Sequence, residues 1–288
     1  MHSPSFCYKE IKIMNLKGKP FYLDDSAVEW VNKTLEKLTE DEKIGQLFFP
    51  IGFSNEKEYL NHLIDLGIGG LFFRPGEAKE VQQAYEYMQR NSKVPLLTAA
   101  NLEDGGNGAS VEGTAFGNQM AVAATNRTSD AYTLGKIAAT EGKSVGVNFG
   151  FSPVVDLDLN FRNPITNVRT YGSDVERVIK NAKEYIQAFH DNGSMTSIKH
   201  FPGDGVDERD QHLLTSINSL SVNNWRKTFG KVYQELIDFG SKAVMVGHIA
   251  FPAYSGDDMP ATLSPKLIND LLRTELGFNG LTITDATP

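Results

Sequence analysis

Short runs of apolar residues recur along the chain, and each is followed by a segment with the spacing of an amphipathic helix. The runs are continuous rather than alternating, which is typical of strands buried on both faces of a parallel sheet. Parallel strands need a crossover, usually a helix, to return the chain between them. The pattern therefore predicts an α/β fold, with strands at residues 46–49, 70–73, 95–98, 147–151, 195–198, 243–246 and 281–284.

The segments between these runs carry helix start and stop signals. Asp25 or Ser26 can cap a first helix that reaches residue 38, and Thr39 with Glu42 forms a capping box for the second. Gly193 is suited to end a helix because glycine adopts the left-handed conformation easily. Further helices are expected at residues 130–144, 173–192 and 265–276.

A TIM-like (β/α)8 barrel is the fold that this alternation favours, because the composition does not change abruptly anywhere in the 288 residues. Only seven strands are predicted, and an open seven-stranded sheet would expose two edges and part of its core. We therefore expect a barrel truncated after the seventh strand, with a natural seven-stranded barrel as the alternative. The predicted organisation is a flexible N-terminal lead-in at residues 1–24 and one barrel domain, lacking its C-terminal end, at residues 25–288.

The charge and the cysteine usage limit the partners and the compartment. The formal net charge is -8 and no basic stripe occurs, so a nucleic-acid partner is not expected. Cys7 is the only cysteine, which excludes an internal disulfide and favours a reducing compartment. Residues 1–20 lack the apolar core of a signal peptide, and no segment is apolar for long enough to cross a bilayer. We predict a cytoplasmic protein that does not bind membranes, although a signal peptide replaced by cloning residues would leave the same pattern.

Polar residues follow five of the predicted strands. In TIM-like barrels the carboxyl ends of the strands form the active site, so these side chains are expected to lie around one mouth. Because ionisable groups are costly to bury without partners, their clustering predicts a functional site. They are Asn101, Glu103 and Asp104 after the third strand, Asp156 and Arg169 after the fourth, Lys199 and His200 after the fifth, His248 after the sixth and Asp285 after the seventh.

The segment after the fifth strand carries the most specific motif of the chain. It reads Lys-His-Phe-Pro-Gly-x-Gly-x4-Asp-x-His from Lys199 to His212, and in its last three residues Asp210 can orient the His212 imidazole. This motif resembles the signature of glycoside hydrolase family 3, in its β-N-acetylglucosaminidase branch. The resemblance extends from about Asp41 to the last residue. It implies a retaining hydrolase that removes terminal β-linked N-acetylglucosamine, with cell-wall fragments as the substrate class.

The resemblance also implies the catalytic residues. Asp285 corresponds to the nucleophile, which would attack the anomeric carbon and stabilise an oxocarbenium-like transition state. His212 corresponds to the general acid/base, with Asp210 as its orienting partner. Without the resemblance, Asp285 could equally cap a following helix. Asp210 could likewise cap a helix beside a surface His212.

Other residues are expected to bind the sugar. The resemblance gives Lys199, His200 and Arg169 this role, although carboxylates could instead hold Lys199 and Arg169 as structural ion pairs. The third-strand motif departs from the family by one extra residue, so either Asn101 replaces the usual substrate-binding aspartate or Asp104 takes over. Glu103, Asp156 and His248 complete the predicted substrate-binding set, and Asp204 is expected to help hold Lys199.

Several alternatives stay open. A β-glucosidase of the same family is the nearest, and a non-catalytic sugar-binding barrel is the second. A metal-dependent barrel hydrolase is disfavoured because the first strand lacks a His-x-His ligand pair, so we expect neither a metal nor a cofactor. Phosphorolysis is a subsidiary hypothesis: a histidine that has given up its proton is neutral and would tolerate an incoming phosphate better than a carboxylate does.

Overall fold

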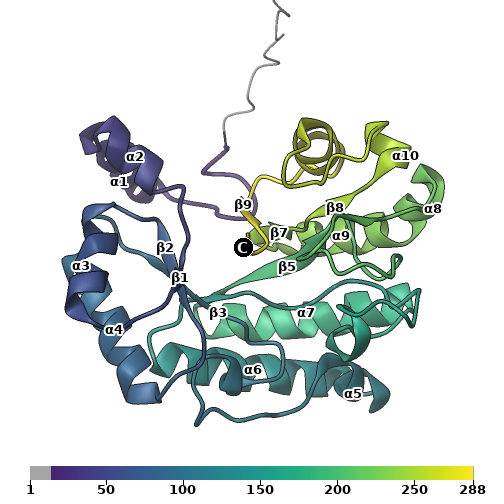
Figure 1. Ribbon diagram of the computed structural model, residues 1–288, viewed down its shortest axis with the longest axis horizontal. Helices are drawn as coiled ribbons and strands as arrows, with labels where there is room; N and C mark the ends of the chain where they lie inside the picture. Colours follow the sequence, from purple (N-terminus) through teal and green to yellow (C-terminus); the bar gives the residue numbers. More distant parts are fainter. Residues whose placement is uncertain (1–13, 288) are drawn as a thin grey trace, which may run out of the picture.

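The computed structural model describes residues 14–287, so Cys7 and most of the predicted lead-in lie outside the described residues. Seven strands form one sheet in which every neighbouring pair is parallel, in the order β1-β2-β3-β4-β5-β7-β9. The sheet curls, and the helices surround its outer face (Figure 1). Its strands are β1 (Ile51–Gly52), β2 (Gly70–Phe73), β3 (Leu97–Ala100), β4 (Phe149–Gly150), β5 (Met195–Phe201), β7 (Ala243–Val246) and β9 (Leu281–Thr284).

The first strand differs from its prediction. Residues 46–49 do not form a strand, because helix α2 (Glu40–Gly45) continues into a turn at Gln46. The amide of Gln46 then donates a hydrogen bond to the Gly67 carbonyl oxygen at 2.8 Å, which holds this turn against the start of β2. The third strand begins at Leu97 rather than at residue 95, and the fourth is shorter than predicted. The last two strands of the sheet have the predicted bounds.

Capping explains where the first helices begin. Asp24, rather than Asp25 or Ser26, accepts the hydrogen bond from Ala27 that caps α1. The predicted capping box of Thr39 and Glu42 is confirmed at the start of α2. Among residues 14–287, none of the helices combines the length and apolarity that a bilayer crossing requires. The remaining helices are α1 (Asp25–Lys37), α3 (Lys57–Asp65), α4 (Ala78–Asn91), α5 (Gln119–Ala124), α6 (Thr128–Ser144), α7 (Val175–Asp191), α8 (Val222–Lys227), α9 (Phe229–Phe239), α10 (Pro252–Ser255), the short 3-10 turns η1 (Gly106–Gly108) and η2 (Asn167–Arg169), and η3 (Lys266–Glu275), which is wound as a π-helix.

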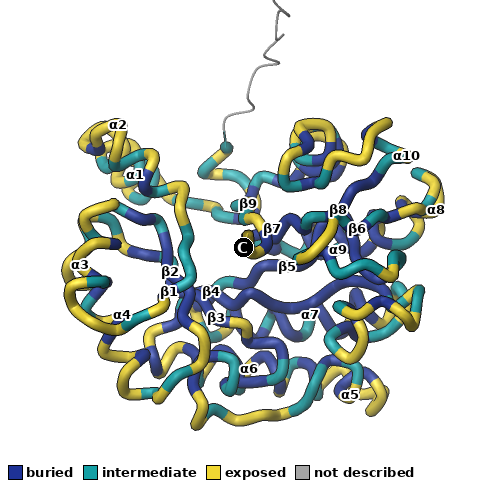
Figure 2. Tube along the Cα trace, viewed as in Figure 1, coloured by how far each residue is buried: buried dark blue, intermediate teal, exposed yellow. Residues whose placement is uncertain are grey.

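Apolar side chains fill both faces of the curled sheet, as the continuous runs predict. The outer face packs on the helices, and buried residues extend through β5, β7 and the helices behind them (Figure 2). The inner face holds a separate cluster in which Phe72, Phe149 and Phe151 pack on one another, with ring centroids 5.1 to 5.6 Å apart along the chain of contacts. A sheet that encloses its own apolar layer is the arrangement of a TIM-like barrel. Strands β1 and β9 form its two edges, so the barrel wall is open between them.

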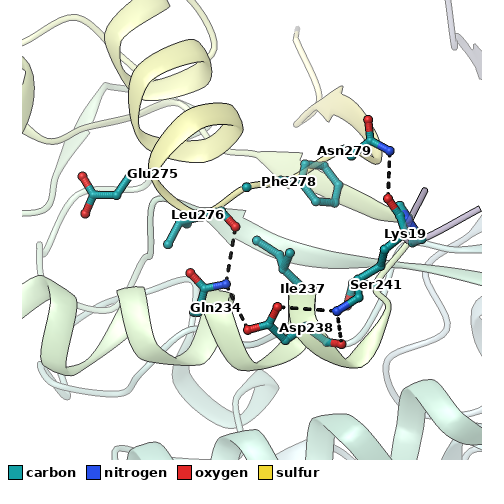
Figure 3. A pocket seen from close by; sticks show the side chains of 11 residues that line it. Lys19, Gln234, Ile237, Asp238, Ser241, Glu275, Leu276, Phe278 and Asn279 are labelled. Atoms are coloured by element: carbon teal, nitrogen blue, oxygen red, sulfur yellow. Dashed lines mark hydrogen bonds and ion pairs between the residues drawn. The ribbon is translucent and has the colours of Figure 1, made fainter. Parts of the chain in front are cut away.

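Hydrogen bonds tie residues 14–24 of the predicted lead-in to the body of the fold. The side chain of Asn279, just before β9, bonds the backbone of Asn15 and Lys19 at 2.8 Å. The Lys19 ammonium donates to the carbonyl oxygen of Asp238 at the end of α9. A cavity of about 400 Å³ lies between these elements, beside the amino-terminal ends of β7 and β9 (Figure 3).

The segment after β5 is anchored by a small second sheet. Strand β6 (Ser216–Ile217) pairs in parallel with β8 (Ile249–Ala250), which directly follows β7. The Asn218 amide adds a bond to the Gly203 carbonyl oxygen at 3.0 Å, so both ends of the intervening loop are fixed. The loop between them carries Asp210 and His212.

Candidate active site

A cavity of about 860 Å³ opens at the carboxyl ends of the sheet strands and extends onto the inner apolar layer. Its polar lining comes from the ends of several strands, as the barrel geometry predicts. Of the described residues that line it, Asp285 is the only acidic one. The other charged or titratable lining residues are Arg74, Arg169, Lys199, His200 and His212.

Glu103 holds two of these cations. Its carboxylate pairs with the Lys199 ammonium at 2.6 Å and accepts two hydrogen bonds at 2.8 Å from the Arg169 guanidinium. The ion pairs outweigh the burial that would raise the pKa of Glu103, and hold that pKa well below its usual range. Lys199 also donates to Asn101 at 3.3 Å. The two cations therefore have fixed positions before any ligand arrives.

His200 is fixed in the same way by Asp156. The Nδ1 atom of His200 lies 2.6 Å from an Asp156 carboxylate oxygen, and the other Asp156 oxygen accepts from the backbone amides of His200 and Asp204. Asp156 is fully buried. This contact turns Nε2 of His200 toward Asp285, whose Oδ2 is 3.7 Å away.

Asp285 follows β9 directly and is 7% exposed. Its Oδ1 accepts a hydrogen bond from the Ala286 amide at 2.8 Å, whereas its buried Oδ2 has no hydrogen-bond partner among the described residues. Burial alone would raise the pKa of Asp285, but His212, His200 and Lys199 together hold it well below its usual range. The carboxyl group is therefore ionised at neutral pH, with one oxygen free to react.

His212 faces the same oxygen from the opposite loop. Its Nδ1 bonds Asp210 at 2.8 Å, which leaves Nε2 directed at Asp285 Oδ2, 3.6 Å away. The contact with Asp285 and then the bond to Asp210 raise the pKa of His212 to about 9, against the opposing effect of burial. The imidazole is therefore protonated at neutral pH and can act as an acid.

Four predicted substrate-binding residues lie outside the cavity lining. The two that do not belong to the third-strand motif, Asp156 and His248, support their neighbours instead. Asp156 turns both oxygens to protein partners, so it orients His200 rather than reaching a sugar. His248 lies between the Thr262 hydroxyl, at 3.1 Å, and the carbonyl oxygen of Ala286, the residue after Asp285, at 2.9 Å.

The other two come from the third-strand motif. Asp104 does not reach the lining, whereas Asn101 does, which favours Asn101 over Asp104 for the predicted role. Glu103 is also absent from the lining, because its carboxylate is occupied by Lys199 and Arg169. Of the three motif residues, only Asn101 therefore lines the cavity.

The expected contact between Asp204 and Lys199 is wrong. Asp204 instead accepts hydrogen bonds from Asn163 at 2.8 Å and from Gln211 at 3.0 Å, because Glu103 already occupies the position beside Lys199. Sequence reasoning also missed Gln211, which no motif distinguishes. It overlooked Arg74 as well, although this residue directly follows β2 and the strand-end rule could have found it.

In the part of the chain that the structure describes, no group of three or more His, Cys, Asp and Glu side chains is arranged to hold a metal ion. The polar cluster instead combines a reactive carboxylate, a protonated imidazole and fixed cations. Such a set can bind a polyhydroxylated ligand and exchange a proton with it on one side of a nucleophile.

Comparisons with a family model and with known proteins identify relatives of the chain. Residues 39–288 match the family model described as the glycosyl hydrolase family 3 N terminal domain. A beta-N-acetylglucosaminidase/beta-glucosidase of Cellulomonas fimi is 45% identical over 285 residues, which cover 96% of this chain and 50% of that protein. The chain thus spans about half the length of this relative.

Two solved structures have the same fold over most of the chain. A beta-glucoside phosphorylase, BglX, superposes with a TM-score of 0.90 at 43% identity, over 94% of this chain and 51% of that one. A family 3 beta-N-acetylglucosaminidase from Paenibacillus sp. str. FPU-7 superposes with a TM-score of 0.81 at 30% identity, over 86% of this chain and 49% of that one. These similarities match the expected fold and family.

Proposed function

The chain belongs to glycoside hydrolase family 3, and on that premise we propose that it carries the catalytic domain of a retaining enzyme that removes terminal β-linked N-acetylglucosamine. The names of the Cellulomonas and Paenibacillus relatives support this sugar. The Cellulomonas relative is also named a beta-glucosidase, so a terminal glucose is the alternative.

The observation that carries the proposal is the buried Oδ2 atom of Asp285, which has no hydrogen-bond partner among residues 14–287. A buried polar atom without a partner is costly, and a catalytic role is one of the explanations for such an atom in a native structure. Here the atom lies between the imidazoles of His200 and His212, at 3.7 and 3.6 Å. A carboxylate oxygen in this setting is ionised, directed at the cavity and suited to attack an anomeric carbon.

The proposed reaction has two steps. In the first, Asp285 Oδ2 forms a bond to the anomeric carbon while the glycosidic bond breaks, and His212 Nε2 gives its proton to the departing oxygen. In the second, neutral His212 takes a proton from water, whose oxygen bonds to the anomeric carbon and releases Asp285. Asp210 keeps the imidazole oriented in both steps, and Lys199, His200 and Arg169 hold the sugar hydroxyls.

The distance between the two catalytic groups predicts a movement on binding. In retaining glycosidases that use two carboxyl groups, these groups stand about 5–5.5 Å apart and flank the scissile bond. Here His212 Nε2 and Asp285 Oδ2 are 3.6 Å apart. We therefore expect the His212 side chain to move outward when a sugar enters, and the ion pair to separate.

Phosphorolysis is a second candidate, favoured by the charge of the cavity. In the part of the chain that the structure describes, the exposed Arg74 guanidinium lines the cavity and forms no hydrogen bond or ion pair. Arg74 adds to the positive charge of Lys199, Arg169 and protonated His212. A phosphate oxygen could then replace water in the second step and release the sugar 1-phosphate. The phosphorylase named among the similar structures supports this reaction class.

The test uses the protein as its gene encodes it, with nitrophenyl β-glycosides of N-acetylglucosamine and of glucose, each in phosphate and in a buffer without a nucleophilic anion. Faster turnover of the N-acetylglucosaminide supports the proposed sugar, and faster turnover of the glucoside supports the alternative. Sugar 1-phosphate detected by phosphorus NMR supports phosphorolysis, whereas equal rates in both buffers without this product remove it. Binding without turnover of either substrate would leave a sugar-binding domain and reject the enzyme.

A further inference from the structure

We propose that Gln211 is the residue that positions the His212 loop for catalysis, by bridging the carboxyl ends of strands β5 and β7. This inference rests on the proposed function, because it concerns the placement of the acid/base. Gln211 lies between Asp210 and His212 in the sequence, at the unspecified middle position of the Asp-x-His pattern, and it is absent from the cavity lining. It acts through its neighbours and is a positioning residue.

The burial of Gln211 contrasts with that of its neighbours. Gln211 is 2% exposed, whereas the side chains of Asp210 and His212 are 30% and 36% exposed. The next residue, Leu213, is 85% exposed. The Gln211 side chain is therefore the part of this turn that enters the body of the protein, and the catalytic pair is carried on either side of it.

Two hydrogen bonds fix the buried amide. Its Oε1 accepts from the His248 backbone amide at 2.8 Å, directly after β7, and its Nε2 donates to Asp204 Oδ2 at 3.0 Å, after β5. The fit is tight as well, because a Cβ atom on Gly247 would lie 2.5 Å from Gln211 Oε1. The two bonds join the loop to both strand ends, so a displacement of Gln211 would displace His212.

The two hydrogen-bond partners, the His248 backbone amide and the Asp204 carboxylate, determine how the Gln211 side-chain amide is oriented and why a glutamine is needed. A backbone amide can only donate, and an ionised carboxylate can only accept, so neither glutamate nor any residue without both functions can replace Gln211 at neutral pH. Burial and the nearby Asp156 raise the pKa of Asp204 to about 6, so Asp204 accepts as a carboxylate at neutral pH. The titratable groups that face Asp204 are Asp156 after β4, His200 of β5 and Tyr233 of α9.

The decisive variant is Gln211→Glu, which keeps the shape and loses the donor. Two carboxylates would then face each other at neutral pH and repel, until a shared proton restores one hydrogen bond in acid. We expect the variant to lose roughly tenfold or more of kcat/KM at pH 7.5 and to regain much of it at pH 5, relative to wild type. Damage that does not come from repulsion between the two carboxylates gives no reason for activity to return in acid.

A double variant should restore the activity that Gln211→Glu loses. In Gln211→Glu with Asp204→Asn, the asparagine amide donates to the glutamate, while its oxygen still accepts from Asn163 and Gly205. We expect this pair to recover most of the lost kcat/KM at pH 7.5. Rates of the double variant that stay at or below those of Gln211→Glu would overturn the proposal.

Rates on two substrates with different leaving groups distinguish a misplaced acid from a general loss of structure. Gln211→Ala should slow the nitrophenyl glycoside more than the dinitrophenyl glycoside, whose leaving oxygen needs little protonation. The matched control is Gln119→Ala, because Gln119 is equally buried and also makes two hydrogen bonds, but to the backbone of Val154. Equal losses on both substrates for Gln211→Ala, as for the control, would contradict the proposed role.

Titration of His212 by NMR tests the inference without turnover. In the wild type its pKa is raised to about 9 by the contact with Asp285. If Gln211→Glu releases the loop, this pKa falls toward the ordinary value of about 6.5. An unchanged titration in the variant would overturn the inference even for an active enzyme. A wild type without turnover would instead reject the proposed function and leave this readout to decide the role of Gln211.

Discussion

The buried floor of the site and the loop above it are built differently. On the floor, the pairs Lys199–Glu103 and His200–Asp156 are buried and have contacts of 2.6 Å. On the loop, His212 is more than a third exposed, and its contact with Asp285 is 3.6 Å long. In the proposed mechanism, the groups that hold the sugar are thus fixed in advance, whereas the side chain that transfers a proton can move.

This difference has a physical reason. Fixed cations bind the sugar without a further ordering cost, and they gain strength from the low dielectric of the buried floor. The acid/base must admit the glycosidic oxygen between itself and Asp285, which a buried side chain could not do. The predictions below test this division between a fixed floor and a movable His212 side chain, from the largest expected effect to the smallest.

Removing the nucleophile should have the largest effect. Asp285→Asn keeps the shape and removes the negative charge, so we expect kcat to fall by roughly 10⁵-fold, as for other covalent nucleophiles. Initial rates on the nitrophenyl glycoside measure the loss. Asp238→Asn, in the distant cavity beside Lys19, is the control and should keep wild-type rates. A loss below tenfold for Asp285→Asn would remove this residue from the mechanism.

Removing the acid/base should cost less and should depend on the substrate. For His212→Ala we expect a loss of about 10²–10⁴-fold on a substrate with a poor leaving group. On a dinitrophenyl glycoside, a glycosyl-enzyme should instead accumulate, because the second step still lacks its base. Mass spectrometry of the intact protein detects this adduct. The absence of both effects would assign the proton transfer to another group.

Removing the Glu103 carboxylate from the floor should reduce both the free energy of unfolding and the affinity for the sugar. Glu103→Ala leaves the buried Lys199 and the half-buried Arg169 without their carboxylate, and losing one partner of a buried pair costs about 3–5 kcal/mol. Glu235→Ala is the comparison, because it breaks the half-exposed pair with Lys183 and should cost no more than about 1 kcal/mol. Chemical denaturation measures both values. If the two variants lose similar free energies of unfolding, the buried ion pairs of the floor contribute no more to stability than a half-exposed pair does.

The pH dependence should be the smallest effect and should come from the loop. The pKa of His212 is raised to about 9 in the folded protein, so its contribution to stability is complete below about pH 6.5 and is lost as the pH rises through 9. The melting temperature should therefore decrease between about pH 7 and 9.5 more in the wild type than in His212→Asn. In the same range, kcat/KM should fall as the acid form is lost. Parallel curves for the two proteins would show that the ion pair does not form in solution.

The fold was largely predictable because its signals are local. Buried runs such as Gly70–Phe73 and Ala243–Val246 are apolar along their whole length, and each recurs at a place where a helix has just ended. The first strand was misplaced because residues 46–49 are also apolar, yet the capped helix α2 ends only at Gly45 and leaves a turn there. An apolar run alone cannot distinguish a strand from the end of a helix.

The site was predictable only in part, for a different reason. That Asp285 and His212 meet follows from the strand-end rule and the motif, and the structure brings them to 3.6 Å. Their supporting partners did not follow. Glu103 rather than Asp204 neutralises Lys199, and Gln211 belongs to no recognisable pattern.

The sequence by itself determined the order of strands and helices and which polar side chains stand at strand ends, because burial and capping depend on near neighbours in the chain. Only the tertiary structure decided which carboxylate faces which cation, and which amide holds the loop. These pairs join the ends of different strands, and their choice depends on small differences in distance that no spacing in the sequence encodes.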